Sequence, residues 1–298
     1  MKIVFPEYHN EIIKAALATY AERSAAGASG FLDARPLQPI EAVAATSLSE
    51  ACDLIKSQAA DTMIAGIDYS SRDVILACRD QFGMGNFAAD LGLTDPAVAL
   101  EDHGAPISAT PYTTFSGLAV MQSPTHDRTY LLADMAACKH PTVAQMTEIV
   151  EQTYASARQI LTDEPRIALL SFSTNGSGGN DPSIDLWREV LTTFEANHSL
   201  VQIAGEMQLD AAVNPTVGKK KFPASTIAGA ANVLIAPDLN SGNLLYKCFE
   251  QIAGYTVAGP ILQGFNRPVS DLSRGSTVED VLLTIEVITR LASASQTA

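Results

Sequence analysis

Short apolar segments alternate with stretches of helical periodicity along most of this sequence. The apolar segments that predict strands are Lys2–Phe5, Thr62–Ala65, Arg166–Phe172, Val201–Gly205, Asn232–Ala236 and Thr256–Leu262. Between them, apolar residues recur every three or four positions, as they do on one face of an α-helix. Strands and helices that alternate at this spacing predict an α/β fold in which helices cover both faces of a sheet.

Two further apolar stretches interrupt this alternation. Thr113–Gln122 and Arg128–Ala137 are separated only by the turn-forming residues Ser123–Asp127. This spacing predicts an antiparallel pair of strands within an otherwise parallel pattern. Beyond the pair, Thr142 can cap a long helix that runs to about Leu161.

The segment Asp271–Asp280 predicts a loop that leads into a helix. Ser276 is a good N-cap, because its hydroxyl can accept a hydrogen bond from a free amide of the first helical turn. Glu279, three residues later, completes a Ser-x-x-Glu capping box. Apolar residues at helical spacing then extend the helix to about Leu291.

Three polar side chains accompany the start of this helix. Ser273 and Arg274 precede it, where free amides and the positive end of the helix dipole favour anions. Asp280 lies about one helical turn beyond the predicted cap. A hydroxyl, a guanidinium and a carboxylate can therefore converge on one anionic ligand. The alternative is a capped surface helix that carries an Arg–Asp ion pair.

A glycine-rich loop, Ser173–Asn180, follows the strand Arg166–Phe172 and precedes a predicted helix at Ser183–Asn197. Ligands of open α/β sheets bind at the carboxyl ends of strands. Small side chains let backbone amides approach a phosphate closely, so this loop is a candidate for phosphate binding. Its spacing matches neither GxGxxG nor a Walker A motif, and a flexible connector is the alternative.

Composition limits the classes of partner. The chain has 298 residues, of which 47% are hydrophobic, which is enough for one large core or two smaller ones. Its net charge of −14 disfavours a nucleic-acid or acidic-membrane partner. No apolar run reaches the roughly 18 residues of a membrane helix, and Met1–Asn10 lacks the apolar core of a secretory signal. We therefore expect a cytoplasmic protein.

The cysteines predict neither a zinc site nor a disulfide framework. None of the four belongs to a CxxC pair, so a reducing compartment is expected. They are Cys52, Cys78, Cys138 and Cys248. Cys138 and His140 are close in sequence, which we attribute to the end of a strand rather than to a catalytic pair. A covalent cysteine mechanism is therefore not expected, and no metal is either.

Four long segments carry a resemblance to a known family. They are ALLSFSTNGSG at Ala168–Gly178, GEMQLDAAVNP at Gly205–Pro215, AGAANVLIAPDLNSGNLLYK at Ala228–Lys247 and GPILQGFNRPVSDLSRGSTVEDV at Gly259–Val281. In this order they resemble the phosphate acetyltransferase (phosphotransacetylase) family. The first half of the chain is similar more loosely, in VFPE, ADTMIAG and YLLADMAACKHPT.

The resemblance implies a fold and a reaction. The implied fold is similar to that of isocitrate and isopropylmalate dehydrogenases, with two α/β domains and the active-site cleft between them. Residues 1–141 and the C-terminal segment 263–298 would form the first domain, and residues 142–262 the second. The implied reaction converts acetyl-CoA and phosphate to acetyl phosphate and coenzyme A, reversibly. Coenzyme A is then a substrate, no cofactor is expected, and a homodimer is implied.

The resemblance also implies roles for particular residues. Ser273, Arg274 and Asp280 take the family's catalytic positions. Asp280 would accept the thiol proton, Arg274 would bind phosphate or the acyl oxygen, and Ser273 would stabilise the transition state. A free Asp has a pKa of about 3.9 and a free thiol about 8.5. Either burial raises the pKa of Asp280, or Arg274 lowers that of the thiol.

The resemblance also implies substrate-binding positions, and the chain departs from the family at two of its ligand-binding arginines. The expected substrate-binding residues are Ser173, Thr174, Asn175, Gly176, Ser177, Gly264 and Arg267. Two arginines that the family uses for ligand binding are replaced, by Leu76 and by Gln251. Arg72, Arg79 or Arg267 can compensate. The only basic run, Lys219–Lys221, can either hold polyanionic coenzyme A or form a solvated surface.

Three other functions stay open. A phosphate propionyl- or butyryltransferase is one, because a single methylene changes binding in an apolar pocket by only ~1–3 kcal/mol. A non-catalytic homologue that binds coenzyme A or a phosphorylated metabolite and regulates a partner is another, and the replaced arginines favour it. A metal-dependent dehydrogenase would need an acidic cluster for its cation, which Asp210 or Asp238 could join only by chance.

Overall fold

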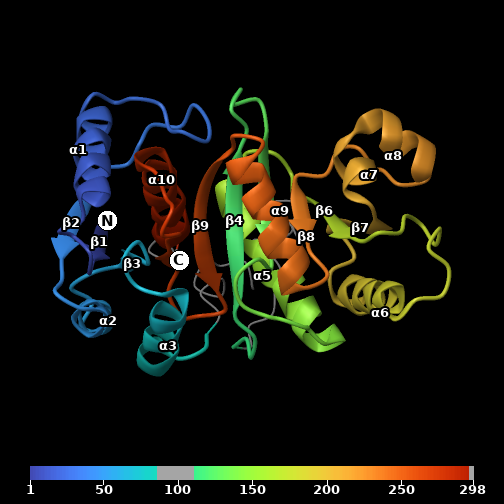
Figure 1. Cartoon of the computed structure of the whole chain (residues 1–298), viewed down its shortest axis with the longest axis horizontal. Helices are drawn as coiled ribbons and strands as arrows, with labels where there is room; N and C mark the ends of the chain where they lie inside the picture. The colour runs from blue at the N-terminus through green and yellow to red at the C-terminus, as the bar shows by residue number, and fades with distance from the viewer. Residues whose placement is uncertain (86–110, 295–298) are drawn as a thin grey trace.

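The computed structural model describes residues 1–85 and 111–294, which form one ten-stranded sheet with helices on both faces (Figure 1). The strands are β1 (Lys2–Phe5), β2 (Glu41–Ala44), β3 (Thr62–Ala65), β4 (Ser116–Gln122), β5 (Thr129–Ala133), β6 (Arg166–Leu170), β7 (Gln202–Met207), β8 (Val233–Ile235), β9 (Thr256–Gln263) and β10 (Val269–Asp271). The helices are α1 (Glu11–Ala25), α2 (Leu48–Lys56), α3 (Ser71–Phe82), α5 (Val143–Ile160), α6 (Pro182–Asn197), α7 (Leu209–Val213), α8 (Pro215–Lys221), α9 (Leu239–Gln251) and α10 (Val278–Ala294). The mixed α/β class expected from the sequence is confirmed.

The sheet consists of two parallel halves joined by an antiparallel centre. Its strand order is β2-β1-β3-β10-β9-β4-β5-β8-β6-β7. Strands β2, β1, β3 and β10 are parallel, as are β5, β8, β6 and β7. Antiparallel β9 and β4 lie between these halves, and β4 pairs with β5 as the sequence predicts. The two parallel halves therefore run in opposite directions.

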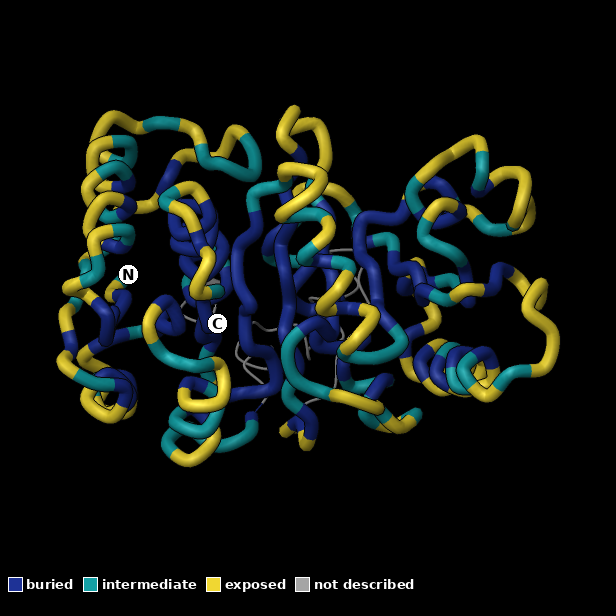
Figure 2. Tube along the Cα trace, in the orientation of Figure 1, coloured by how far each residue is buried: buried dark blue, intermediate teal, exposed yellow. Residues whose placement is uncertain are grey.

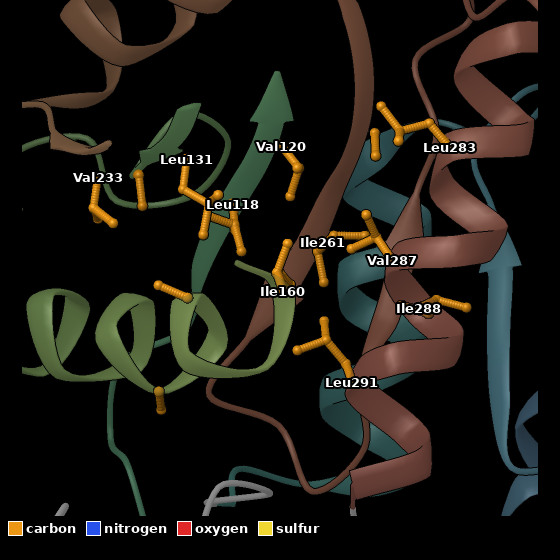
Figure 3. Close-up of a cluster of buried hydrophobic side chains, with 14 of the residues drawn as sticks. Leu118, Val120, Leu131, Ile160, Val233, Ile261, Leu283, Val287, Ile288 and Leu291 are labelled. Carbon is orange, nitrogen blue, oxygen red and sulfur yellow. The ribbon is translucent and has the colours of Figure 1, made fainter. Parts of the chain in front are cut away.

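One face of the sheet is covered by a continuous core. Helices α1, α10, α5 and α6 all contribute buried apolar side chains to it. Figure 3 shows Ile261 of β9 beside Val287 of α10 within this core, and Ile160 of α5 near the side chains of β4 and β5. Burial of this apolar surface is the main driving force for the fold. In Figure 2 the central strands and α10 are buried, whereas the outer turns of α1 and α8 are exposed.

The opposite face carries two separate helical groups. Helices α2 and α3 pack on β1, β3 and β10, whereas α7, α8 and α9 pack on β5, β6 and β8. The two groups bury different sets of apolar side chains. A pocket described below lies between α3 and α9. Within the described residues, no helix is both long and apolar enough to cross a membrane.

The start of α10 differs from the sequence prediction by one residue. Thr277 caps the helix: its hydroxyl accepts from the Asp280 amide at 3.2 Å, and Asp280 Oδ2 accepts from the Thr277 amide at 2.8 Å. The predicted capping box of Ser276 and Glu279 is therefore wrong. Ser276 with Glu279 and Thr277 with Asp280 both fit a Ser/Thr-x-x-acid pattern. Asp280 also accepts a hydrogen bond from the amide of Val257 at 2.9 Å, and this contact favours the helix start at Thr277.

Three short elements were not predicted. They are β2, β10 and α8, and β10 lies partly within the segment that the sequence suggested was a loop. In α8, Lys219–Lys221 occupies the last turn, where cations stabilise the negative end of the helix dipole. Lys221 also pairs with Asp210 at 2.7 Å. The basic run thus has a structural role that does not require coenzyme A.

Candidate active site

A cavity of about 230 Å³ lies between α3 and α9, and we call it the α3–α9 pocket. Three segments supply the polar groups of its wall. They are the β3–α3 turn with Gly66 and Ser71, helix α9 with Asn243 and Lys247, and the loop after β10 with Ser273 and Arg274. Two of the predicted catalytic residues, Ser273 and Arg274, therefore meet in one pocket with a lysine that the sequence did not single out.

A buried glutamate holds the β3–α3 turn. Glu7 is only 1% exposed. Its Oε2 accepts from the amides of Gly66 and Ile67 at 2.9 and 3.2 Å, and its Oε1 accepts from those of Asp68 and Tyr69 at 2.7 Å each. Successive amides that point inward form a concave anion site. Because the Glu7 carboxylate fills it, this wall of the pocket is fixed before any ligand binds.

Asp134 plays the same part on another wall. Its Oδ1 accepts from the amides of Gly117, Ala136 and Ala137 at 2.8, 2.9 and 3.1 Å, and its Oδ2 accepts from that of Cys138. Burial raises the pKa of Asp134, and these amide bonds oppose the shift. The turn after β5, which carries Ala136 into the pocket, is held rigid by one carboxylate.

Lys247 connects α9 to the predicted catalytic loop. Its ammonium donates to Ser273 Oγ at 3.1 Å, pairs with Glu250 at 2.9 Å and lies 4.4 Å from the ring centroid of Tyr246. Burial lowers the pKa of Lys247, but Tyr246 and Glu250 outweigh it and the net shift is upward. The pocket therefore contains a stable positive charge beside the Ser273 hydroxyl.

Asp280 lies behind this cluster and does not line the pocket. It is 5% exposed, and its Oδ1 accepts from the amide of Val257, while Oδ2 accepts from the amide and hydroxyl of Thr277. Burial raises the pKa of Asp280, these hydrogen bonds oppose the shift, and the charge of Glu250 adds to it. The carboxylate thus holds the start of α10.

The glycine-rich loop lies outside the pocket and is already saturated with internal bonds. Ser173 Oγ donates to Glu206 Oε1 at 2.8 Å, and the amide of Gly176 donates to the same oxygen at 2.7 Å. The amide of Gly178 donates to Ser173 Oγ at 2.8 Å. Thr174 Oγ1 accepts from the amide of Gln208. The Glu206 carboxylate thus accepts hydrogen bonds from two of the donors that the loop could offer to an anion.

Of the other predicted loop residues, Asn175 and Ser177 are exposed. Gly264 and Arg267 lie in the connection between β9 and β10, also outside the α3–α9 pocket. Gly264 has φ +86°, and its carbonyl accepts from the amide of Gly85 at 3.0 Å. A Cβ at Gly264 would collide with the carbonyl of Thr114. The backbone conformation alone therefore explains why position 264 is a glycine.

The replaced family arginines also lie outside the pocket wall. Leu76 is half-buried on α3, and Gln251 is exposed at the end of α9. Gln251 Nε2 donates at 3.0 Å to the same Glu250 oxygen that Lys247 contacts. Gln251 thus reaches the pocket only through Glu250. Within residues 1–85 and 111–294, no cluster of three or more His, Cys, Asp or Glu side chains could hold a metal.

A larger cavity, of about 300 Å³, opens at the amino ends of β5 and β6. Arg128 and Arg166 line it together with Asp33, Asp127 and Asp163. Arg166 already donates to the backbone of Ala230 and Glu164. Because its charges are mixed and it contains none of the predicted site residues, we assign the chemistry to the α3–α9 pocket.

The structure describes an α/β protein in which Lys247 and Arg274, two cations that favour an anionic ligand, line the α3–α9 pocket. The family model described as phosphate acetyl/butaryl transferase matches residues 97–289. The chain belongs to this family. The resemblance that the sequence motifs carry is thereby confirmed.

Individual curated relatives carry a name from the same family. The phosphate acetyltransferase of Treponema pallidum is 42% identical over 154 residues, which are 51% of this chain and 46% of the relative. That of Corynebacterium glutamicum is 41% identical over 160 residues, 54% of this chain and 48% of the relative. The matched segment spans about half the length of these curated relatives.

Two solved structures match nearly the whole chain. A phosphotransacetylase from Streptococcus pyogenes aligns with a TM-score of 0.74 and 27% identity, covering 99% of this chain and 94% of that one. A branched-chain phosphotransacylase from Enterococcus faecalis aligns with a TM-score of 0.71 and 21% identity, covering 98% and 99%. At the lower identity the likeness shows the fold alone.

Proposed function

We propose that this chain is a phosphate acyltransferase that converts acetyl-CoA and phosphate to acetyl phosphate and coenzyme A, reversibly. The observation that carries the proposal is the α3–α9 pocket, where Arg274, Lys247 and the Ser273 hydroxyl meet in a chain of net charge −14. Local positive charge in an acidic protein favours a small, highly charged anion. Family membership supports phosphate as that anion.

The two cations divide the binding of phosphate between them. Arg274 presents a planar fork of donors, whereas Lys247 is a point charge already held by Glu250. A phosphate oxygen attacks the thioester carbon; the new C–O bond forms, the C–S bond breaks, and sulfur leaves with the electron pair. Ser273 Oγ lies beside the ammonium and can donate to the oxygen or sulfur on which negative charge develops.

Asp280 is our candidate for moving the proton. The hydrogen-phosphate substrate loses its proton and the leaving thiolate gains one, so protons balance without an external acid. Burial raises the pKa of Asp280, which brings the carboxylate closer to the range of a thiol. To reach the sulfur, Asp280 must exchange one of its bonds to Val257 or Thr277 for a bond to the substrate.

We propose direct transfer in a ternary complex without an acyl-enzyme. Burial raises the pKa of Cys52 to about 11 and that of Cys78 well above its usual value. Burial also raises the pKa of Cys138. A thiolate is therefore disfavoured at these three positions. We expect intersecting double-reciprocal lines, and an acyl group trapped on a cysteine would contradict this mechanism.

The length of the acyl chain is the main open choice. The pocket also has an apolar side formed by Met135, Ala136, Pro260 and Leu272. Such a surface accommodates extra methylenes with small energetic differences, so propionyl and butyryl transfer are the alternatives within the same reaction. The replacement of family arginines by Leu76 and Gln251 favours a different alternative, a regulatory protein that binds coenzyme A or a phosphorylated metabolite without turnover.

One assay separates these possibilities. Thiol release is measured with acetyl-, propionyl- and butyryl-CoA, each with and without inorganic phosphate, and the acyl phosphate is detected directly. We expect release that depends on phosphate and is fastest with acetyl-CoA. Release without phosphate would indicate a thioesterase, and no release with saturable binding of acyl-CoA would favour the regulatory protein.

The remaining expectations of the family likeness are also proposals. We propose two domains, residues 1–141 with 263–298 and residues 142–262, with the α3–α9 pocket belonging to the cleft between them. A cytoplasmic homodimer that uses only acyl-CoA, acyl phosphate and phosphate, with no further cofactor, follows from the same likeness. Sedimentation equilibrium of the full chain measures the mass of the assembly and tests the dimer.

A further inference from the structure

Asp271, the last residue of β10, is a buried group that the proposed reaction leaves without a role. Its side chain is fully buried, and within the part of the chain that the structure describes neither carboxyl oxygen has a hydrogen-bond partner. Buried polar atoms are almost always paired, and a buried unpaired ion is especially unfavourable. The position of Asp271 next to the α3–α9 pocket suggests a role for this buried carboxyl group.

The carboxyl group lies directly behind one wall of the α3–α9 pocket. A Cβ atom at Gly66 would come within 2.5 Å of Asp271 Oδ1. The glycine therefore makes room for the acid to approach the wall. Ser71, at the start of α3, is exposed and lines the same pocket. The Ser71 hydroxyl is close enough to lower the pKa of Asp271, and Ser71 lines the pocket whereas Asp271 does not.

The charges around Asp271 favour its neutral form. Burial raises the pKa of Asp271 to about 7; the Ser71 hydroxyl lowers it and the fixed charge of Glu7 raises it. On the α3 side the neighbouring titratable group is Cys78, whose own pKa burial raises. Lys247 and Arg274 face the pocket from α9 and from the loop after β10. Near neutral pH a large fraction of the molecules thus carries Asp271 as a carboxylic acid.

We propose that Asp271 is a positioning residue that turns the hydroxyl of Ser71 toward the phosphate, and that Ser71 contacts the phosphate directly. The inference rests on the proposed function of the pocket. A neutral Asp271 has an O–H that donates to Ser71 Oγ and leaves the serine O–H free to donate to a phosphate oxygen. An ionised Asp271 can only accept. It then draws the serine O–H away from the ligand.

Anion binding and protonation of Asp271 are therefore linked. A bound anion stabilises the neutral acid, so binding near pH 7 takes up a proton. Sulfate is a suitable probe because, unlike phosphate, it does not change its charge near neutral pH. Calorimetric titration of the full chain with sodium sulfate, in two buffers of different ionisation enthalpy, measures both the affinity and the protons taken up.

The wild type and two variants give distinct results. Wild-type affinity for sulfate should fall about tenfold or more between about pH 6 and pH 8.5, because each pKa unit of linkage is tenfold. Asp271→Asn, whose amide still donates to Ser71, should change by less than ~threefold over the same range and take up no proton. Ser71→Ala should bind sulfate weakly at both pH values, also without proton uptake.

A double variant and a control complete the test. In the Ser71→Ala background, Asp271→Asn should have no further effect on affinity. Asp163→Asn, an exposed aspartate outside the pocket, should behave like the wild type. A wild-type affinity that does not change with pH, or a pH dependence that persists in Asp271→Asn, overturns the proposal. If Asp271→Asn does not fold, the surface variant Ser71→Ala decides the question. Proton uptake by Ser71→Ala that equals the uptake by the wild type also overturns the proposal.

These outcomes are independent of turnover. Sulfate binding is measured without acyl-CoA, so a failure of the proposed function appears separately, as absent thiol release by a protein that still binds sulfate. A protein that transfers acyl groups but shows no linkage between sulfate and protons refutes only the role of Asp271.

Discussion

The ammonium of Lys247 donates a 3.1 Å hydrogen bond to the hydroxyl of Ser273, across 26 residues of sequence. The lysine thereby joins helix α9 to the loop that follows β10. It also brings a positive charge to the serine that the family likeness identifies as catalytic. We propose that α9 is part of the catalytic apparatus, although the sequence motif that carries the serine and arginine contains no residue of that helix.

The first prediction concerns this lysine. Lys247→Met removes the ammonium while keeping the apolar length of the side chain. Loss of a comparable preorganised donor lowers kcat by about 10²–10³, and the KM for phosphate should rise because one of the two cations is gone. Initial rates with varied phosphate measure both. Lys219→Met, which removes an exposed lysine from α8, should leave the rates unchanged.

A second variant separates stability from catalysis. Lys247→Met leaves the Glu250 side chain, which is only 8% exposed, with Gln251 as its hydrogen-bond partner among the contacts described. Adding Glu250→Gln should restore the melting temperature without restoring the rate. Recovery of the rate by the double variant would show that Lys247 acts only by neutralising Glu250.

The second prediction concerns Arg274, which is exposed in the pocket. Arg274→Ala should lower kcat by about 10²–10³ with no change in melting, since an exposed side chain contributes little to stability. Arg274→Lys should rescue little, because an ammonium lacks the planar fork of a guanidinium. Arg188→Ala, at an exposed ion pair on α6, is the matched control. Near-wild-type rates in both Arg274 variants would refute the assignment.

Asp280→Asn should behave differently from the arginine variants. An amide nitrogen cannot accept from the backbone, so one of the bonds that Asp280 receives from Val257 or Thr277 is lost. We expect a loss of stability of about 1–3 kcal/mol together with a slower rate. Rates must therefore be measured well below the melting temperature. A stable variant with a normal rate would show that the carboxylate is dispensable.

Local signals account for what the sequence predicted correctly. The capping box at Thr142 and Gln145 forms at the start of α5, because both partners lie within one turn. Strand β3 was recognised because it is buried on both faces, so that apolar residues 63–65 follow one another without an intervening charged residue. These elements depend on neighbours in sequence. The start of α5 after Thr142 and the end of α6 at Asn197 follow from the same information.

Tertiary contacts account for what the sequence missed. β10 has only three residues and ends in Asp271, and a charged residue beside a serine predicts a loop unless its burial is known. The residues around Lys247 in the sequence are a mixture of apolar and polar types that is typical of any surface helix. Its role depends on Ser273, which only the folded sheet brings near. The Asn243–Lys247 spacing, which places both side chains on one helical face, was the one signal in the sequence.

The third prediction tests the corrected start of α10. Thr277→Ala removes the hydroxyl that accepts from the Asp280 amide and donates to Asp280 Oδ2. Loss of an N-cap costs about 1 kcal/mol. Ser276→Ala should have a clearly smaller effect on the free energy of unfolding, although the serine is buried. Urea titration of both variants measures the difference. A larger effect of Ser276→Ala would show that Ser276, and not Thr277, caps the helix.

The fourth prediction concerns stability and pH at Asp271. Burial raises its pKa from 3.8 in an exposed aspartate to about 7 in the folded chain. The folded state therefore binds a proton more tightly than the unfolded state does. Stability from this group is full at low pH, is lost as the pH rises toward 7, and changes no further above that.

Asp271→Asn removes this dependence because its amide does not titrate. Each pKa unit corresponds to about 1.4 kcal/mol, so between about pH 5 and pH 8 the wild type should lose about 3 kcal/mol relative to the variant. Urea unfolding of both proteins at the two pH values measures the difference, with Asp163→Asn as a control that should track the wild type. If the difference between wild type and Asp271→Asn is the same at both pH values, the folded state binds no more protons at Asp271 than the unfolded state does in this range. The buried group would then be a carboxylate throughout this range, as in the unfolded chain, and the pH linkage proposed for anion binding would lose its physical basis.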